Sequence, residues 1–305
     1  MKGIETVAVV GAGGFLGANL APFLAPRVRD LRCYGRRCSF PEVFSDLRWI
    51  TGNITDENLG DVLDGCDVVI HLASTSTPAT ADRDIVADAE ANVIGTLRLL
   101  ECCVAKRVGR IVFLSSGGTV YGIPTIVPTP EDAATNPISA YGAAKLSIEK
   151  YLEIFRRHHG LDYRILRVSN IYGPHQTAEK GQGVIAAFLS RALDGRPLEI
   201  WGDGEIIRDY IYVSDVVDAI WKAMNHHGEV RILNIGSGRG TSINQIASAI
   251  EKRLGRPLDL VFRPGRPVDV PTSILDCSLA SRELDWCPQI SLDTGLDLLV
   301  NWIGR

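Results

Sequence analysis

Tyr141 and Lys145 lie four residues apart in the stretch SAYGAAK, residues 139–145. Ser139 is a residue type that caps helices and alanine favours them, so the stretch predicts the first turns of a helix. On a helix this spacing places the phenol and the ammonium group on one face. A free phenol has a pKa of about 10, and a neighbouring positive charge lowers that value. The pair is therefore a candidate for acid–base catalysis.

Three glycines, Gly11, Gly14 and Gly17, follow the strand-like run TVAVV and open a helical pattern. This strand–turn–helix context is the one that a dinucleotide fingerprint requires. The first glycine permits the tight turn, the second lets the backbone approach a pyrophosphate, and the third lets the helix pack closely on the strand. The three residues predict a dinucleotide site.

The second predicted strand does not end in the acidic residue that would hold an adenosine ribose 2′-hydroxyl. The sequence there is LRCYGRR, in which Gly35 is followed by Arg36 and Arg37. Arginine can pair with a 2′-phosphate, which would favour NADP; a solvent-exposed basic loop is the alternative interpretation. These residues alone leave NAD and NADP both open.

The elements that must position these residues alternate along the first half of the chain. Short β-branched runs such as DVVIHLAS and RIVFLSS are separated by helical patterns, of which ADAEANVIGTLRLLECCVAKR is the clearest. Such alternation predicts an α/β fold, a Rossmann-type doubly wound parallel sheet, joined to a smaller C-terminal α/β substrate domain. We expect the dinucleotide domain over residues 1–170, with 209–235 returning to it, and the substrate domain over 171–208 and 236–305.

Composition narrows the class of protein. The 305 residues carry a net charge of −4 with 46% hydrophobic and 22% charged residues, and no basic stripe points to nucleic acid. The apolar runs are broken by glycine and proline, so no membrane span is expected, and the N-terminal residues lead directly into a strand rather than a signal peptide. Seven scattered cysteines and six histidines predict free thiols, no metal site and a cytoplasmic protein.

Taken together, the motifs resemble the extended short-chain dehydrogenase/reductase family, and within it the nucleotide-sugar epimerases. The resemblance covers nearly the whole chain and is carried by GAGGFLG, GNITD, HLAS, SSGGTVYG, YGAAK, RVSNIYGP, WGDGEIIRDYIYVSDVVDAI and LNIGSG. It implies a tightly bound NAD, with NADP less favoured, and a UDP-sugar substrate. It also implies a homodimer built on the helix at 89–107 and the Tyr141 helix, where Leu146, Ile148 and Leu152 could serve both the contact and the core.

The resemblance assigns the chemistry residue by residue. Tyr141 is the catalytic phenol, Lys145 supports it and holds the nicotinamide ribose, and Ser116 is the hydroxyl that bonds the reacting sugar oxygen. Ser115 and Thr119 are the other hydroxyls in FLSSGGTVYG, and Ser115 is expected to be structural. The implied cofactor contacts are Gly11, Gly14, Phe15, Leu16, Gly17, Arg36, Asn53, Ile54, Leu72, Ala73, Tyr141 and Lys145.

The chain departs from the 4,6-dehydratases of this family at one informative point. Those enzymes carry an Asp-Glu pair where this chain has Gly117 and Gly118. Without the two carboxyl groups no acid–base pair is visible for the elimination of water. The expected reactions are therefore 4-epimerisation through a transient 4-keto sugar, or simple ketoreduction.

The resemblance also implies how the nucleotide sugar is held. Asn170 and Arg208 match residues that contact the diphosphate, although an asparagine here could simply form a turn. Arg266 matches a second diphosphate-binding arginine, with Arg263 near enough to take its place. The uracil is expected at LEIWG, from Leu198 onwards, through backbone contacts.

One position bears on the choice of sugar. Glucose-specific relatives carry a tyrosine three residues before the Asp of a D-x-S-x-A segment; here that position is Ser273, or Thr272 or Ile274 if the match slips by one. Each is smaller than tyrosine and leaves room for an N-acetyl group. We therefore expect 4-epimerisation of UDP-GlcNAc and UDP-GalNAc, with UDP-glucose and UDP-galactose also accepted. The alternatives are an NADPH-dependent 4-ketoreductase, a UDP-uronic acid 4-epimerase and a non-catalytic dinucleotide sensor. The retained Ser116, Tyr141 and Lys145 argue against the sensor.

Overall fold

The computed structural model describes residues 3–78, 80–177, 183–265 and 270–304. Its larger unit is built on a seven-stranded parallel sheet in the order β10-β6-β5-β4-β1-β2-β3. The strands are β1 (Thr6–Val10), β2 (Asp30–Gly35), β3 (Trp49–Thr51), β4 (Val68–His71), β5 (Arg110–Ser116), β6 (Asp162–Val168) and β10 (Ile232–Ile235). The expected doubly wound Rossmann arrangement is confirmed, and the chain order reverses between β1 and β4.

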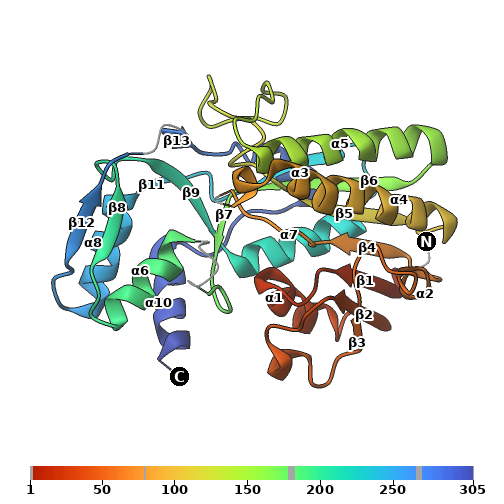
Figure 1. Cartoon of the computed structure of the whole chain (residues 1–305), viewed down its shortest axis with the longest axis horizontal. Helices are drawn as coiled ribbons and strands as arrows, with labels where there is room; N and C mark the ends of the chain where they lie inside the picture. The colour runs from red at the N-terminus through yellow and green to blue at the C-terminus, as the bar shows by residue number, and fades with distance from the viewer. Residues whose placement is uncertain (1–2, 79, 178–182, 266–269, 305) are drawn as a thin grey trace.

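Helices cover both faces of this sheet, because successive strand residues are apolar on both sides. Figure 1 shows α3, α4 and α5 together at the top of the larger unit, while α1 and α7 pack together on the other face of the sheet. Ala8 and Val10 of β1 belong to the core under α4 and α5, whereas Val7 and Val9 belong to the core under α1 and α7. The helices are α1 (Phe15–Leu24), α2 (Leu59–Leu63), α3 (Ile85–Asp88), α4 (Gly95–Ala105), α5 (Ala140–His159), α7 (Val213–Asn225) and α9 (Ser278–Leu284).

The long helix expected before β5 forms with an interruption. A π-helical turn, η3 (Ala89–Ile94), joins α3 to α4, and the Asp84 carboxylate caps α3 by accepting the Ala87 N–H at 3.0 Å. Such turns widen the helix locally and occur frequently at functional sites. This one brings Asp88 and Asn92 toward the ends of the neighbouring strands, as described below.

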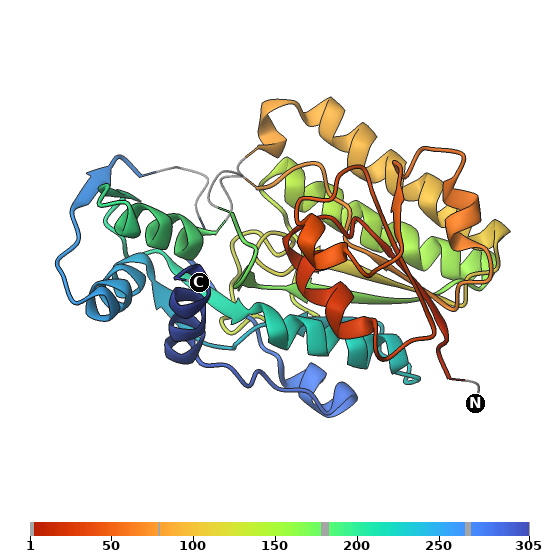
Figure 2. The ribbon, with the colours of Figure 1, turned by 90° about the horizontal axis from the view of Figure 1, so that it is seen from below.

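The smaller unit has a core of its own. It contains a sheet of β7 (Asn170–Tyr172), β9 (Ile207–Tyr212), β11 (Gly240–Ser242) and β13 (Thr272–Ser273), and a pair formed by β8 (Leu198–Trp201) and β12 (Leu260–Arg263). Its helices are α6 (Val184–Leu193), α8 (Ile243–Leu254) and α10 (Leu292–Ile303). Figures 1 and 2 both show this unit beside the larger one, on the side away from the N-terminus.

The segment that we expect to return to the larger unit, 209–235, contains elements that pair with both sheets. β9 pairs with β7, β11 and β13 of the smaller sheet, whereas α7 packs on α1 and β10 joins the large sheet. We therefore propose 213–235 as the returning segment in place of 209–235. After β13 the chain returns once more, because α9 packs against β10 and α7.

Two helix ends carry residues that favour them. Ser139 caps α5 by accepting the Gly142 N–H at 3.2 Å, and Gly255 ends α8 in the left-handed region. Asp215 lies in the first turn of α7 and accepts the Ile290 N–H at 3.0 Å. Its buried carboxylate therefore joins α7 to the segment before α10.

All seven cysteines are free. Over the described ranges no three or more His, Cys, Asp and Glu side chains are grouped to hold a metal ion. No helix among the described residues has the length and apolar content to cross a membrane.

Candidate functional site

A cavity of about 660 Å³ opens beyond the carboxyl ends of β1, β2, β3 and β4, where the chain order of the sheet reverses. Open parallel sheets bind ligands at this point. Seven of the expected cofactor residues line the cavity: Gly11, Gly14, Arg36, Asn53, Ile54, Leu72 and Ala73. Phe15, Leu16 and Gly17 do not line it, because they form the first turn of α1, where Phe15 and Leu16 pack into the apolar cores. Tyr141 and Lys145, the other two expected contacts, lie on α5 and do not line it either.

The glycine turn fits a dinucleotide pyrophosphate. Gly11 has φ +89°, and a Cβ there would lie 2.4 Å from Ala73 N, while a Cβ on Gly17 would lie 2.0 Å from Ala12 O. The fold itself therefore requires both of these glycines. At Gly14 the nearest atom to such a Cβ is Gly11 O at 3.8 Å, so the protein's own packing does not demand glycine there. Its bare backbone instead leaves the N-terminus of α1 open to an anionic ligand.

The π-helical turn forms another wall of this cavity. Asn92 Oδ1 accepts the Thr75 N–H at 2.9 Å, and Asn92 Nδ2 donates to Asp88 Oδ1 at 2.9 Å and to Ser76 Oγ at 3.1 Å. Thr75 and Asn92 both line the cavity. Our sequence analysis missed these residues; the one available signal was a polar Asn-bearing stretch inside an otherwise apolar helical pattern.

The phenol and ammonium of Tyr141 and Lys145 lie together, as their spacing predicts. Lys145 Nζ is 5.6 Å from the centroid of the Tyr141 ring and 4.8 Å from that of Phe113. Lys145 is buried and donates to Leu114 O at 2.9 Å, which holds it against the end of β5. The pair therefore sits beside the strand that ends in Ser116.

Burial shifts the pKa values of this pair. Burial, with a smaller contribution from the Asp88 carboxylate, raises the pKa of Tyr141 to about 12. Burial also lowers the pKa of Lys145 to about 8, although Asp88 and Glu149 act in the opposite direction. Among the protein's own groups desolvation of the phenolate therefore dominates, and a bound nicotinamide ring would bring the second positive charge on which the expected lowering of the phenol pKa depends. Tyr141 is neutral at pH 7 unless further positive charge is brought to it.

Of the three hydroxyls near this pair, one is already used. Ser115 is buried and donates to Glu149 Oε1 at 2.5 Å, which supports the structural role expected for it. Ser116 is half-buried at the end of β5. Thr119 Oγ1 is buried without a hydrogen-bond partner in the described chain, and the Thr119 carbonyl lies 2.8 Å from where a Cβ on Gly142 would stand. Ser116 and Thr119 are therefore the hydroxyls available to a ligand next to α5.

Glu149 anchors a buried polar network behind the site. It pairs with Arg167 at 2.7 Å, with both side chains at most 3% exposed. Arg167 Nη1 donates to Tyr121 OH at 2.9 Å, and Tyr121 OH donates to Asn234 Oδ1 at 2.7 Å. The network ties α5 to β5, β6 and β10. Sequence reasoning missed it, although Glu149 lies one helical turn after Lys145.

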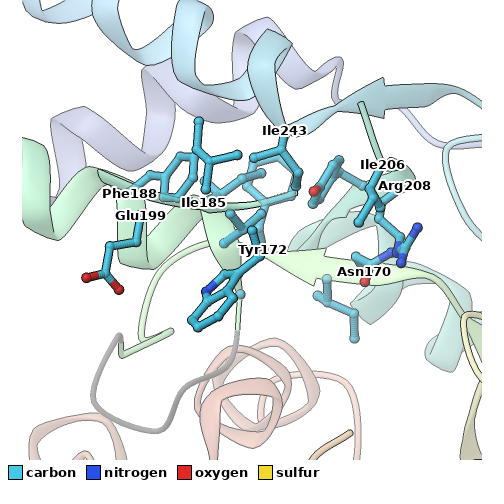
Figure 3. Close-up of a pocket in the computed structure, with 14 residues that line it drawn as sticks. Asn170, Tyr172, Ile185, Phe188, Glu199, Ile206, Arg208 and Ile243 are labelled. Atoms are coloured by element: carbon cyan, nitrogen blue, oxygen red, sulfur yellow. The ribbon is translucent and has the colours of Figure 1, made fainter. Parts of the chain in front are cut away.

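A second cavity, of about 330 Å³, lies in the smaller unit. Figure 3 shows Asn170 and Arg208 together at one end, with Ile185, Phe188 and Ile243 toward the other. The Glu199 carboxylate lies near Phe188, so the end away from Arg208 is apolar with an acidic group beside it. A cationic and amide end next to a largely apolar wall suits a ligand that joins an anionic group to a flat ring. The two residues expected at the diphosphate are thus brought together.

Three other expected contacts need comment. The Leu198 side chain is buried in the core, and its N–H donates to Asp259 O. We therefore expect the uracil to contact the next residues of the segment, Glu199, Ile200 and Trp201, which line the cavity. Arg266 lies outside the described residues. Its alternative, Arg263, pairs with Glu199 at 3.1 Å beside the cavity.

Ser273 lies in β13 directly opposite Arg208 of β9. Two residues later, the Leu275 side chain is so close to Gly117 that a Cβ there would lie 2.5 Å from Leu275 Cδ1. Ile274 instead packs against Gly240. Because alternate residues of an extended segment share a side, Ser273 faces the side of Leu275 and Gly117, and Ile274 faces away.

Comparison with known proteins adds independent evidence. The model of the NAD-dependent epimerase/dehydratase family matches residues 7–236. Among curated relatives, a UDP-glucose 4-epimerase of Mycolicibacterium smegmatis is 36% identical over 94% of this chain and 95% of its own. A putative UDP-glucose 4-epimerase of Methanocaldococcus jannaschii is 33% identical over 97% of this chain and 98% of its own. A dTDP-4-dehydro-6-deoxyglucose reductase of Escherichia coli is 31% identical over 97% of each chain.

Solved structures agree over the whole chain. A UDP-glucose 4-epimerase of Thermotoga maritima, with UDP-glucose, has a TM-score of 0.94 at 38% identity and covers 98% of this chain and 99% of its own. A UDP-N-acetylglucosamine 4-epimerase of Methanobrevibacter ruminantium has a TM-score of 0.91 at 27% identity (99% of each). A UDP-glucuronic acid 4-epimerase of Bacillus cereus, with NAD, has a TM-score of 0.89 at 26% identity (98% and 99%).

Proposed function

The chain belongs to the NAD-dependent epimerase/dehydratase family, and we propose that it interconverts UDP-sugars that differ in configuration at carbon 4. The family match confirms our expectations of an enzyme of this family and of NAD as its cofactor. Relatives and structural neighbours named as UDP-glucose, UDP-N-acetylglucosamine and UDP-glucuronic acid 4-epimerases support a UDP-sugar substrate.

One observation carries this proposal: the expected catalytic groups lie at and beside the carboxyl end of β5, next to β6, and the chain that follows β6 lines the second cavity. Ser116 is paired in register with Val168, and Asn170, which lines the second cavity, follows two residues later. Lys145 is fixed to Leu114 O on the same strand as Ser116. A sugar whose diphosphate is held by Asn170 and Arg208 would therefore present its ring to Ser116 and Tyr141.

In the proposed reaction Tyr141 removes the proton of the sugar 4-hydroxyl and later returns it. Ser116 donates a hydrogen bond to the same oxygen and so fixes it beside the phenol. Lys145 contributes a positive charge that favours the phenolate form of Tyr141. The chemistry that NAD supplies when bound is reversible removal of hydride from carbon 4.

The site offers nothing for dehydration where related dehydratases carry two carboxyl groups. A Cβ at Gly117 would lie 2.5 Å from Leu275 Cδ1 and 3.0 Å from Arg167 O, so an acidic side chain does not fit there. Gly118 has open space but bears no side chain. This supports epimerisation or ketoreduction over elimination of water.

We propose that the sugar is an N-acetylhexosamine, with UDP-GlcNAc and UDP-GalNAc as the pair. Support comes from Ser273, which faces the side of Gly117 with a small side chain and is the favoured residue because Ile274 packs away against Gly240. A small residue there need not exclude the smaller UDP-glucose.

A second candidate, an NADPH-dependent 4-ketoreductase, is favoured by Arg36 and Arg37 at the cofactor cavity. The Escherichia coli relative named as a reductase of a deoxysugar nucleotide supports keeping it. The two candidates differ in whether an external reductant is consumed.

Tyr141→Phe tests the catalytic assignment, because it removes the hydroxyl and keeps the ring. We expect turnover to fall at least ~100-fold, in line with general acid–base contributions, while dinucleotide binding is kept. Tyr151→Phe, at an exposed position of the same helix, is the matched control and should turn over normally. Near-normal turnover by Tyr141→Phe would remove the phenol from the mechanism.

A further inference from the structure

The segment 272–276 joins the two halves of the candidate site. Its Ser273 is paired in register with Arg208, which lines the second cavity. Two residues later, the Leu275 side chain fills the space beside Gly117, where a Cβ would lie 2.5 Å from Leu275 Cδ1. Gly117 directly follows β5, the strand that ends in the expected catalytic hydroxyl. The segment therefore spans the distance between an expected diphosphate contact and that hydroxyl.

The loop after β5 holds this segment by main-chain hydrogen bonds. The Thr129 N–H donates to Ile274 O at 2.8 Å, and the Asp276 N–H donates to Thr129 O at 2.9 Å. Between these two bonds, the Leu275 N–H donates to the fully buried Asp209 carboxylate of β9 at 3.3 Å. The segment is thus held both by the loop of the larger unit and by the sheet of the smaller one.

Asn234 of β10 fixes both partners of this contact. Its side chain is fully buried, and Nδ2 donates to Thr129 O at 2.9 Å and to Asp276 O at 3.2 Å. Its main-chain N–H donates at 2.8 Å to Oε1 of Glu131, which lies two residues beyond Thr129 in the same loop. One buried residue therefore ties the loop to the segment 272–276 and both of them to the large sheet.

Tyr121 orients the Asn234 amide. Its hydroxyl donates to Asn234 Oδ1 at 2.7 Å and accepts from Arg167 Nη1 at 2.9 Å. Because Oδ1 accepts this bond, the two N–H groups of the amide point to the carbonyls of the loop and the segment. Arg167 is in register with Asn234 on the neighbouring strand and pairs with Glu149 of α5. The same chain of contacts therefore reaches the helix that carries the expected catalytic pair.

We propose that Asn234 and Tyr121 are positioning residues: by fixing the segment 272–276 they set where the sugar ring meets Tyr141. The proposal rests on the proposed function, because it requires a UDP-sugar whose diphosphate is held in the second cavity. A misplacement of about 1 Å can cost about 100-fold in rate, so a loosened segment lowers kcat. The Ser273 end stays paired with β9, so binding of UDP is kept.

Tyr121→Phe and Asn234→Ala test the proposal, with Tyr163→Phe as the matched control. Tyr163 is also buried and donates to a glutamate of α5, Glu153, at 3.0 Å, so the control loses a similar hydrogen bond outside this chain of contacts. We expect kcat for the UDP-sugar to fall at least tenfold in both test variants and to change less than twofold in the control. The dissociation constant of UDP should change less than twofold in all three.

Amide hydrogen exchange measures how firmly the segment is held, without any turnover. The Leu275 and Asp276 amides should exchange at least tenfold faster in both test variants than in wild type or in Tyr163→Phe. If Asn234→Ala does not fold, Tyr121→Phe alone decides. A smaller fall in kcat, unchanged exchange, or loss of UDP binding in Tyr121→Phe overturns the proposal. Absence of UDP-sugar interconversion by the wild type would overturn the proposed function, whereas unchanged exchange with normal interconversion would overturn only the positioning role.

Discussion

At the scale of single residues, Lys145 is the group whose charge is most sensitive to its surroundings. Its ammonium is buried between the rings of Phe113 and Tyr141, and the charged groups that act on it are the Asp88 and Glu149 carboxylates. His71 lies close enough for Lys145 to help hold the His71 pKa low, at about 3, after the larger effect of burial. His71 is therefore neutral at ordinary pH, whereas Lys145 changes charge near pH 8.

This burial predicts a pH dependence. Because the pKa of Lys145 is lowered to about 8, the ammonium that favours the phenolate is lost as pH rises through that value. Above pH 8 this loss offsets the tenfold gain in phenolate that each pH unit brings to Tyr141, whose pKa is about 12, so turnover should rise up to pH ~8 and then level off. Lys145→Arg keeps its charge over this range, so its pH–rate profile should continue to rise above pH 8. Levelling off at the same pH in both proteins would show that another group controls it.

The same shift has a defined sign for stability. Between pH 8 and 10.5 the folded protein holds less of a proton on Lys145 than the unfolded chain does. The contribution of Lys145 to the free energy of unfolding therefore rises with pH across this window, and is least favourable below it. The Lys145 contribution to stability is thus expected to rise over a pH window in which turnover is level.

Ser273 carries the prediction on substrate choice. Ser273→Tyr should abolish turnover of UDP-GlcNAc by steric conflict and spare that of UDP-glucose, while Ser273→Thr should turn over both. Packing lost or gained in such a pocket is worth about 1–3 kcal/mol, so the change for UDP-glucose should stay within about 200-fold. Progress curves for UDP-GlcNAc and UDP-glucose with wild type, Ser273→Tyr and Ser273→Thr show whether Ser273 sets the choice of substrate. If Ser273→Tyr handles UDP-GlcNAc like wild type, the substrate is set elsewhere, and UDP-glucuronic acid becomes the next sugar to test.

At the scale of elements, the face formed by α3 and α5 is left partly uncovered. Ile85 and Val86 of α3 are 60% and 69% exposed, and Ile154 of α5 is 45% exposed. Figure 1 shows the two helices together on one side of the sheet. Ile148 and Leu152, expected to serve the dimer contact as well as the core, are buried in the core, and Leu146 packs around Val120 and Tyr121. The residues free to make a contact are thus the exposed ones.

We expect a homodimer through this face. Wild type should sediment as a dimer at micromolar concentration, and the double variant Val86→Arg, Ile154→Arg should sediment as a monomer because it places charges in an apolar contact. Leu193→Arg, on a similarly exposed leucine of α6, should remain dimeric. A wild-type monomer, or a dimer that tolerates the double variant, would contradict this assignment.

What the sequence could predict at this scale was local. The glycine turn, the Ser139 cap and the Tyr141–Lys145 spacing each depend on residues a few positions apart, and the structure contains all three. The π-helical turn that presents Asp88 and Asn92 has no comparably short signature. Glu149, Arg167 and Asn234 meet only because β5, β6 and β10 are adjacent, so their network depends on long-range pairing.

At the scale of the whole molecule, the two units divide the work of binding. The larger unit holds the cavity that we propose for the dinucleotide, and the smaller unit holds the cavity of Asn170 and Arg208, which we propose for the nucleotide sugar. The doubly wound order was predictable from strand–helix alternation, because parallel strands need crossover helices. The residue at which the chain returns to the larger unit was not predictable, because β9 and α7 are contiguous in sequence yet belong to different units.

The central claim is that the protein is a 4-epimerase that needs no external reductant, and proton NMR of the sugar tests it most directly. Purified protein is mixed with UDP-GlcNAc, and separately with UDP-GalNAc, with no cofactor added; the same pair of experiments uses UDP-glucose and UDP-galactose. We predict that both members of at least one pair convert to the same equilibrium mixture, with Tyr141→Phe slower by at least ~100-fold. Absence of interconversion in both pairs, together with NADPH-dependent reduction of a 4-keto sugar nucleotide, would contradict the claim.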